Sequence, residues 1–204
     1  MRKIITISRE FGSGGRELRK RLADELGFKY YDKEILEKIL ENDNYDDTYI
    51  KNFSEKQLVT NTLHYANSFY IYESIQNPRT EIIAEEHKLL RKLANKENCV
   101  IVGRAANSIL KEFDPFNIFV YSDMKYKLER CRTKGTEEEA ELTNENIEKQ
   151  INKIDKGRKK YYESVSDLKW GNKLDFDLCI NTSKMEIKKM VPSLASYIKE
   201  FYKQ

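Results

Sequence analysis

The amino-acid sequence predicts an α/β fold, in which helices cover both faces of a doubly wound parallel sheet of about five strands. Two observations carry this prediction. Four short runs, at 3–8, 99–103, 117–121 and 177–181, are nearly continuous in Ile, Val or Phe, which is typical of strands buried on both faces. Helical patterns lie between these runs, and strands that alternate with helices indicate βαβ units. Right-handed crossovers then place the carboxyl ends of the strands at one edge, where ligands bind.

The elements follow one another in a regular order. After the first strand, apolar residues from Leu18 to Leu26 recur at helical spacing, and Gly27 is the expected end of that helix. Residues 28–31 predict a fifth, short strand. Further helices are expected over about 33–41, 55–76, 80–97, 104–112, 124–133, 143–164 and 184–203.

Length, charge and hydropathy exclude several classes of protein. The 204 residues suffice for one ordinary domain. With 37 basic and 34 acidic residues the formal net charge is +3, which is too balanced to indicate a nucleic-acid partner. No stretch approaches the roughly 18 apolar residues that a membrane-spanning helix needs, so we expect no membrane partner.

The cysteines and histidines do not form a recognisable metal-binding or catalytic motif. Cys99, Cys131 and Cys179 are far apart and form no Cys-x-x-Cys pair, so we expect reduced, mostly buried thiols and a cytoplasmic protein. His64 and His87 lack the spacing of metal ligands, which argues against a zinc site and against a Ser-His-Asp hydrolase.

The most informative stretch joins the first strand to the first helix and reads Ile7-Ser8-Arg9-Glu10-Phe11-Gly12-Ser13-Gly14-Gly15-Arg16-Glu17. Glycines let successive backbone N–H groups turn toward one point, and the start of a helix adds partial positive charge there. We therefore predict that this glycine loop binds phosphate through Gly12, Ser13, Gly14, Gly15, Arg16 and Glu17. The alternative is a tight strand-to-helix turn without a ligand.

The loop departs from the phosphate-loop pattern Gly-x-x-x-x-Gly-Lys-[Ser/Thr], and two alignments stay open. If Gly14 is the second glycine, Arg9 stands at the first, Gly15 replaces the lysine and Arg16 replaces the Ser/Thr. If the alignment shifts by one residue, Arg16 takes the place of the lysine and Glu17 that of the magnesium ligand. The dinucleotide-binding pattern fails as well, because Glu17 stands where its third glycine belongs.

Several blocks of this sequence resemble the cytidylate kinase-like family of bacteria, relatives of the nucleoside monophosphate kinases within the P-loop fold. The blocks span nearly the whole chain in the family's order. They are the glycine loop, Phe28-Lys29-Tyr30-Tyr31-Asp32-Lys33-Glu34, Val100-Ile101-Val102-Gly103-Arg104-Ala105-Ala106, Tyr161-Tyr162, Trp170-Gly171 and the segment 175–183.

The resemblance implies a single P-loop kinase-like domain over residues 1–204. Its core would comprise about 1–32, 99–133 and 174–204. A helical insertion similar to the monophosphate-binding segment would occupy about 33–98, and a mobile lid-like segment about 134–173.

The resemblance further implies a phosphotransferase that moves the γ-phosphoryl group of ATP to a nucleoside monophosphate or a similar small phosphorylated acceptor. Small nucleotides are then the partners, with ATP and Mg²⁺ as cofactors and Glu17 as the expected metal ligand. Phosphoryl transfer asks mainly for positioning and charge neutralisation. We expect Arg16, Arg104 and Arg158 to be catalytic.

Four of the expected site residues come from outside the glycine loop. Arg104 follows a strand, where a charge faces the ligand edge; a structural salt bridge is the alternative. Asp32 ends the short strand and could contact the acceptor; an ordinary helix N-cap is the alternative. Arg130 is a candidate nucleotide-binding residue, and Arg158 is the expected lid arginine.

The chain departs from true cytidylate kinases in the loop lysine and Ser/Thr, and in Ala105, which stands where they carry Asp. The resemblance therefore does not imply cytidine specificity. A nucleotide-binding regulatory module without catalysis is a second hypothesis, and a nucleic-acid-binding protein using the basic faces 16–21 and 153–160 is a third. The amphipathic C-terminal helix could pack on its own sheet or in a homodimer.

Overall fold

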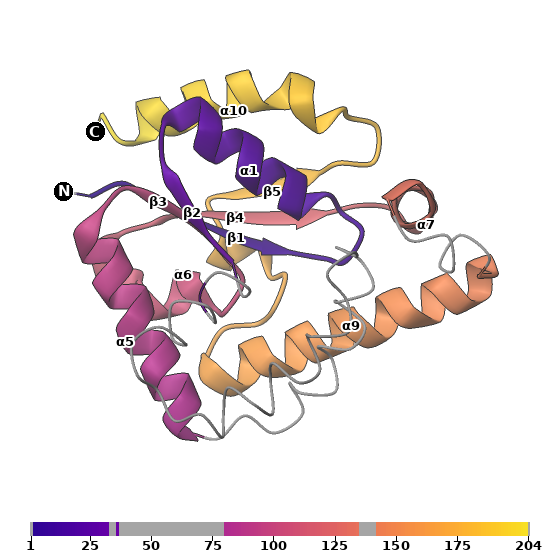
Figure 1. Ribbon diagram of the computed structural model, residues 1–204, viewed down its shortest axis with the longest axis horizontal. Helices are drawn as coiled ribbons and strands as arrows, with labels where there is room; N and C mark the ends of the chain where they lie inside the picture. Colours follow the sequence, from indigo (N-terminus) through magenta and orange to yellow (C-terminus); the bar gives the residue numbers. More distant parts are fainter. Residues whose placement is uncertain (1, 33–35, 37–79, 135–141, 204) are drawn as a thin grey trace.

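The computed structural model describes residues 2–32, 36, 80–134 and 142–203 (Figure 1). Its centre is a five-stranded sheet in the order β2-β3-β1-β4-β5, with all neighbouring strands parallel. The strands are β1 (Ile4–Arg9), β2 (Lys29–Tyr31), β3 (Cys99–Val102), β4 (Phe116–Tyr121) and β5 (Leu178–Asn181). The predicted parallel sheet is confirmed, and every predicted strand ends within one residue of the observed one.

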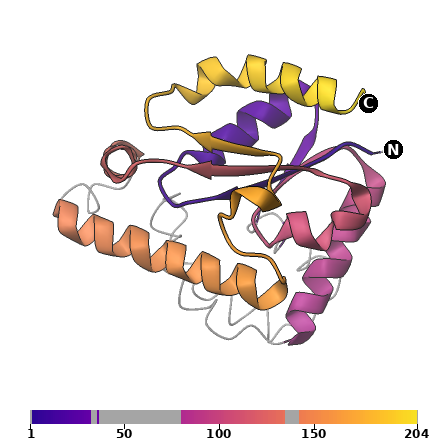
Figure 2. The same ribbon diagram turned by 180° about the vertical axis from the view of Figure 1, so that it is seen from behind.

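Helices cover both faces of this sheet (Figures 1 and 2). On one face lie α1 (Gly15–Leu26) and α10 (Ile187–Phe201). On the other side lie α5 (Thr80–Lys96), α6 (Ala106–Ile109) and the long α9 (Asn144–Val165), while α7 (Met124–Lys134) follows β4. Two short 3-10 turns, Lys111–Phe113 and Lys173–Asp175, complete the described elements. None of the described helices combines the length and the apolar character that crossing a membrane requires.

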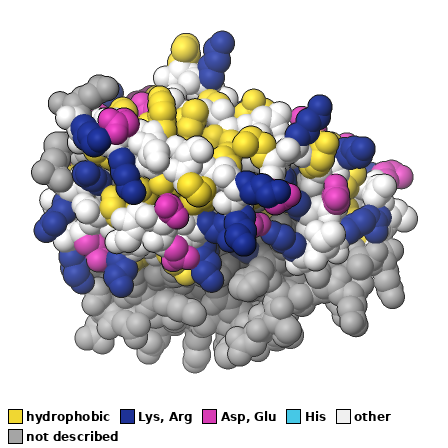
Figure 3. Space-filling model, turned by 90° about the horizontal axis from the view of Figure 1, so that it is seen from above, with side chains coloured by type: hydrophobic (Ala, Val, Ile, Leu, Met, Phe, Trp, Pro, Cys, Tyr) yellow, Lys and Arg dark blue, Asp and Glu magenta, His cyan; other side chains and the backbone are white. Residues whose placement is uncertain are grey.

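The first core lies between the sheet and the pair α1 and α10. Leu18 and Leu22 of α1 and Val191, Leu194 and Ile198 of α10 pack against inward-facing strand residues. The apolar face of α10 therefore packs against the sheet of its own chain. Figure 3 shows that the outer side of this layer mixes apolar side chains with lysines and arginines.

The second core lies on the opposite face of the sheet. Leu89, Leu90 and Leu93 of α5 pack there with Ile101 of β3. Tyr162 of α9 joins the same cluster, and its hydroxyl accepts a hydrogen bond from Asn107 Nδ2 at 2.8 Å. Part of the predicted insertion, residues 80–96, is thus packed directly on the sheet.

A third, smaller apolar cluster attaches α9 to the glycine loop. Ile147, Ile151 and Ile154 of α9 pack with Phe11 of the loop and with Cys131 of α7. These isoleucines recur at helical spacing and form one face of α9. The predicted lid-like segment therefore contains a helix that shares an apolar cluster with Phe11 of the loop.

Of the predicted helices that fall on described residues, most agree with the structure and two are shorter. The helix expected over 184–203 spans Ile187–Phe201. The helix expected over 104–112 begins only at Ala106, because Gly103, Arg104 and Ala105 adopt positive φ angles of 78°, 58° and 51°. The helices expected over 33–41, apart from residue 36, and over 55–76 lie outside the described residues. The proposed division into core, insertion and lid stays a prediction.

Candidate functional site

The glycine loop connects the central strand β1, which ends at Arg9, to α1, which begins at Gly15. Gly14 precedes the helix in the left-handed region, at φ 83° and ψ 10°, and no side chain caps the helix start. A side chain at this position would be strained and would also meet Ile187 Cδ1 at 2.3 Å. Gly14 thus brings no side chain that could cap the first backbone N–H groups of α1, which are the groups that an anion at a helix start contacts.

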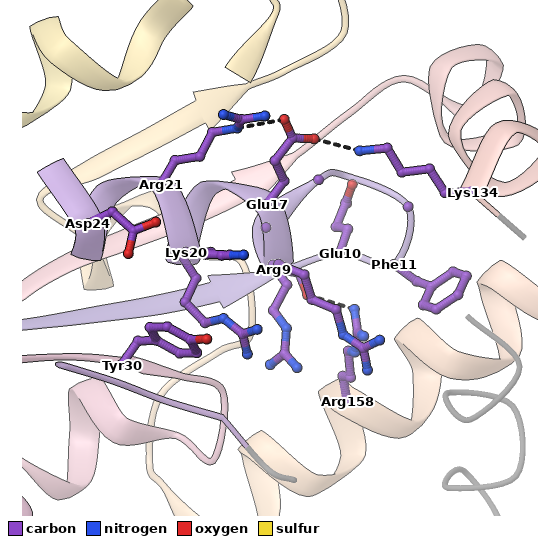
Figure 4. A pocket seen from close by; sticks show the side chains of 15 residues that line it. Arg9, Glu10, Phe11, Glu17, Lys20, Arg21, Asp24, Tyr30, Lys134 and Arg158 are labelled. Atoms are coloured by element: carbon purple, nitrogen blue, oxygen red, sulfur yellow. Dashed lines mark hydrogen bonds and ion pairs between the residues drawn. The ribbon is translucent and has the colours of Figure 1, made fainter. Parts of the chain in front are cut away.

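A pocket of about 780 Å³ opens at this loop (Figure 4). Most of the described residues that line it are charged, and several are arginines. Its residues are Arg9, Glu10, Phe11, Gly12, Gly14, Gly15, Arg16, Glu17, Arg19, Lys20, Arg21, Asp24, Tyr30, Lys134 and Arg158.

The loop is supported from behind by β5 and α7. Thr182 Oγ1 donates a hydrogen bond to Ser13 O at 2.7 Å, and Arg130 reaches Gly12 O at 3.4 Å and Thr182 O at 2.6 Å. The Ser13 side chain is fully buried, and its hydroxyl donates to Glu10 O at 2.8 Å. Ser13 and Arg130 therefore shape the loop and do not line the pocket.

Helix α9 holds the loop from the other side. Asp155 Oδ1 accepts a hydrogen bond from the Phe11 amide at 2.7 Å. Lys127 Nζ lies 3.5 Å from Asp155 Oδ2 and 2.8 Å from Glu10 Oε2. Arg158 Nη1 donates to Arg9 O at 3.1 Å. Burial raises the pKa of Asp155, although Arg158 and Lys127 act to lower it.

Five arginines converge on the pocket and its floor. Burial lowers the pKa of Arg9, and the neighbouring guanidinium groups lower it further; they belong to Arg158, Arg16, Arg19 and Arg104. Three of these four are held by carboxylates, as described below. The site therefore concentrates positive charge, which favours a ligand with several negative charges.

Arg104 belongs to a buried polar group beneath the site. Its Nη2 lies 3.1 Å from Glu86 Oε1, and Tyr161 donates a hydrogen bond to Glu86 Oε2 at 3.0 Å. Arg104 also lies over the Tyr161 ring, 5.4 Å from its centroid. The salt bridge that was the alternative interpretation of Arg104 is thus present, and its predicted role at the ligand edge stays a prediction. The two consecutive residues with positive φ, Arg104 and Ala105, store strain of the kind that gathers at functional sites.

Asp32 and Arg19 form a second ion pair, at the edge of the site. Arg19 also stacks over the Tyr30 ring, with 4.7 Å from its Cζ to the centroid. The backbone carbonyl of Asp32 accepts from Leu36 N at 2.9 Å. Asp32 is nearly buried and is paired to an arginine, so its carboxylate is fixed in orientation.

Glu17 lies on the outer side of α1, between two cations (Figure 4). Arg21 Nε lies 2.8 Å from Oε1 and Lys134 Nζ lies 2.5 Å from Oε2. Burial raises the pKa of Glu17, but the hydrogen bonds from Lys134 and Arg21 outweigh it, and the net shift is downward. Within the described residues, no three Asp, Glu, His or Cys side chains gather as a metal-binding group.

The structure brings six of the ten predicted site residues together in the pocket wall. They are Gly12, Gly14, Gly15, Arg16, Glu17 and Arg158. The other four, Ser13, Asp32, Arg104 and Arg130, are not among its described lining. Each is committed to the loop or to an ion pair, and a direct role in binding stays a prediction for these four.

Sequence reasoning missed the other nine lining residues, which include Arg9, Arg19, Lys20, Tyr30 and Lys134. Arg9 could have been found from the sequence, because it occupies the first-glycine position of one loop alignment. Arg19 could also have been found, since it lies one helical turn after Arg16 and therefore on the same side of the helix. Nothing in the sequence indicates that Lys134, at the end of α7, reaches the first turn of α1.

Comparison with protein families gives one match. The model of the family described as the cytidylate kinase-like family matches residues 4–184. No curated protein matches this chain.

Solved structures share the fold over almost the whole chain. An uncharacterized protein from Eubacterium ventriosum is 25% identical, with a TM-score of 0.71 over 97% of this chain and 99% of that one. Shikimate kinase from Acinetobacter baumannii is 16% identical, with a TM-score of 0.54 over 98% and 94%. A gluconokinase from Sinorhizobium meliloti is 10% identical, with a TM-score of 0.54 over 98% and 93%. The last two likenesses concern the fold, which is that of P-loop kinases.

Proposed function

The chain belongs to the cytidylate kinase-like family, and on that premise we propose that it is a phosphotransferase that moves the γ-phosphoryl group of ATP to a nucleoside monophosphate or a similar small phosphorylated acceptor. Family and fold indicate a P-loop kinase that binds nucleotides. The observation that carries the proposal is the arginine-rich pocket at the glycine loop.

The residues present fit a phosphate chain. Among the described residues, no hydrogen bond occupies the backbone amides of Gly14 and Gly15, which lie at the positive end of α1. The Nε atom of Arg9 is buried without a hydrogen-bond partner, and such an atom favours an acceptor from outside the chain. When bound, ATP would supply the phosphoryl group, while these residues would hold and orient its phosphates.

Family membership implies a divalent cation together with ATP, and we propose Mg²⁺. Mg²⁺ keeps several waters and often binds through one or two carboxylates together with substrate phosphates, so a dedicated protein cage is not required. Glu17 lines the pocket and could be such a ligand only after leaving Lys134 and Arg21. We therefore expect the metal to be held mainly by nucleotide oxygens and water.

Arginines would supply the charge that phosphoryl transfer needs. Arg16, in the first turn of α1, would contact donor phosphates. Arg158 would act from α9, where it already lies beside Arg9. Arg104 would act through the electrostatic effect of its positive charge on the phosphates and by fixing the shape of the 103–105 turn. The paired Arg19 and Asp32 are the candidates to meet the acceptor.

Binding without transfer is the second candidate function. The observation that favours it is the loop itself, where Gly15 and Arg16 stand in place of the lysine and the Ser/Thr in one alignment. A protein of this kind would hold a nucleotide and report its presence to a partner. The cytoplasmic location and a homodimer stay predictions beside either function.

One pair of measurements separates the two functions. ADP release is followed in a coupled assay over a panel of nucleoside monophosphates with ATP and Mg²⁺, and ATP binding is measured by calorimetry on the same protein. Binding with turnover of at least one acceptor supports the kinase. Tight binding without turnover on the whole panel supports the module, and the absence of both binding and turnover overturns both functions.

A further inference from the structure

The side chain of Arg9 runs through a passage that two glycines leave open. A Cβ atom on Gly15 would lie 2.8 Å from Arg9 Cβ and 2.9 Å from Arg9 Cγ. A Cβ atom on Gly103 would lie 2.1 Å from Arg9 Nη1. These distances are below any ordinary carbon contact, so a side chain at either position would displace Arg9. The aliphatic part of Arg9 thus occupies space that is open because residue 15 is glycine, and its guanidinium occupies space that is open because residue 103 is glycine.

The first of these glycines stands where one loop alignment puts the P-loop lysine. With Gly14 as the second glycine of the pattern, the lysine belongs at position 15. A lysine there would begin in the space that the stem of Arg9 fills. The lysine and the arginine exclude each other, because both side chains would have to enter the same space.

The charge of Arg9 is not balanced within the described part of the chain. Arg19 pairs with Asp32, Arg104 with Glu86, and Arg158 with Asp155. For the Arg9 guanidinium, by contrast, the described residues offer no hydrogen-bond acceptor and no carboxylate. A partly buried cation without a partner costs folding free energy, and a bound anion would offset that cost.

We propose that Arg9 is the cation that contacts the donor phosphoryl oxygens in this pocket, in the place of the lysine that position 15 lacks. The proposal rests on the proposed function, because it names the residue that grips the nucleotide. A guanidinium differs from a lysine in that its planar fork binds two phosphoryl oxygens at once. Gly15 and Gly103 are, on this account, part of the phosphate site through the room they leave.

The proposal predicts opposite effects on folding and on binding. Arg9→Met removes an unbalanced charge and keeps an apolar stem of similar length. We expect the melting temperature of the free protein to rise or stay unchanged, and the affinity for tripolyphosphate and ATP to fall about tenfold or more, as expected for loss of a charged, two-pronged contact. A purely structural arginine would instead give a lower melting temperature.

The test measures tripolyphosphate and ATP binding by calorimetry without metal, so that no turnover is needed. The matched control is Arg91→Met, because Arg91 is an exposed residue of α5 paired with Glu112. Gly103→Ala should weaken binding as Arg9→Met does, since its new methyl group displaces the guanidinium. The double variant Arg9→Gly/Gly15→Lys should bind more tightly than Arg9→Gly alone, because it moves the cation to the usual position.

The outcomes separate this inference from the proposed function. If the wild-type protein binds neither tripolyphosphate nor ATP, both are overturned. If the wild type binds and Arg9→Met binds equally well, only the role of Arg9 is overturned. Weaker binding of Arg9→Met with a lowered melting temperature also overturns it, as does a loss of affinity in Arg91→Met of the same size. Weaker binding with an unchanged or raised melting temperature supports it.

Discussion

Asp155 in the middle of α9 accepts a hydrogen bond from the backbone amide of Phe11 in the glycine loop, with 2.7 Å between Oδ1 and N. The carboxylate also faces Lys127 and Arg158. This contact means that α9 and the loop share one polar junction, whose strength depends on the protonation of a single side chain.

The pH dependence of stability should change in Asp155→Asn. Burial raises the pKa of Asp155 in the fold above its ordinary value of 3.8, so ionisation costs folding free energy. This cost is absent below pH 3.8 and develops as the pH rises through the folded pKa. The variant keeps an amide oxygen for Phe11 N and cannot ionise. We expect the melting temperature of the variant, relative to that of the wild type, to increase as the pH rises from about 4.

The control for this series is Asp167→Asn, at an exposed bend after α9. Asp167 takes no part in the junction between α9 and the loop, so this variant makes the same chemical change away from that contact. If the wild type instead gained on Asp155→Asn with rising pH, the attraction of Lys127 and Arg158 would outweigh burial, and the direction assigned to the pKa would be wrong.

Arg16→Ala should cost more nucleotide affinity than Arg132→Ala. Arg16 lines the pocket in the first turn of α1, whereas Arg132 is exposed and donates to Leu142 O and to Asn144 Oδ1. We expect a loss of about tenfold for Arg16→Ala, as for one charged hydrogen bond, and no change for Arg132→Ala. Calorimetry with ATP measures both, and equal effects would show that the binding site is misplaced.

Arg104→Met should destabilise the fold by about 3 kcal/mol, because it leaves the Glu86 carboxylate buried without its cation. The two side chains are only 11% and 3% exposed. Glu86→Gln should also destabilise, and the double variant Arg104→Met/Glu86→Gln should recover part of the loss. Urea unfolding measures the three free energies. A double variant whose loss equals the sum of the two single losses would show that the pair does not interact.

Tyr202→Phe should destabilise the fold by about 2 kcal/mol, as expected when a partly buried amide loses its acceptor. The phenol donates to Ile4 O at 2.5 Å and accepts from Phe116 N at 3.1 Å, so it joins the C-terminal end of α10 to two strands. Tyr197→Phe is the matched control, because Tyr197 is 55% exposed. Thermal or urea unfolding compares the two, and equal stabilities would mean that water replaces the phenol without loss.

Local patterns were enough to predict the sheet and most of the helices. The apolar runs that begin at Ile4 and Cys99 form buried parallel strands, because only such strands need continuous apolar sequence on both faces. Gly27 ends α1 as expected, in the left-handed conformation at φ 67°. The helix after β3 was predicted too long, because nothing in the sequence indicates that Arg104 and Ala105 adopt positive φ angles.

The site was predicted less completely, because its key contacts join distant segments. The glycine loop was recognised from its own residues. Arg9 was not assigned to the site, because its importance depends on the space beside Gly15 and Gly103. Arg130 is predicted to bind nucleotide, and no local pattern indicated that it also binds Gly12 O and Thr182 O from behind the loop. Pairings of this kind follow from tertiary packing and leave no local pattern.

The position of β1 in the middle of the sheet constrains the order in which the protein folds. Ile4 pairs with Cys99 and Ile5 with Phe116, so both partner strands of β1 lie about half a chain later in the sequence. Such distant pairing slows folding, because a large loop must close before any contact forms. Until β3 and β4 are available, the run of isoleucines in β1 therefore stays uncovered, and unpaired apolar strands of this kind make folding intermediates prone to aggregation.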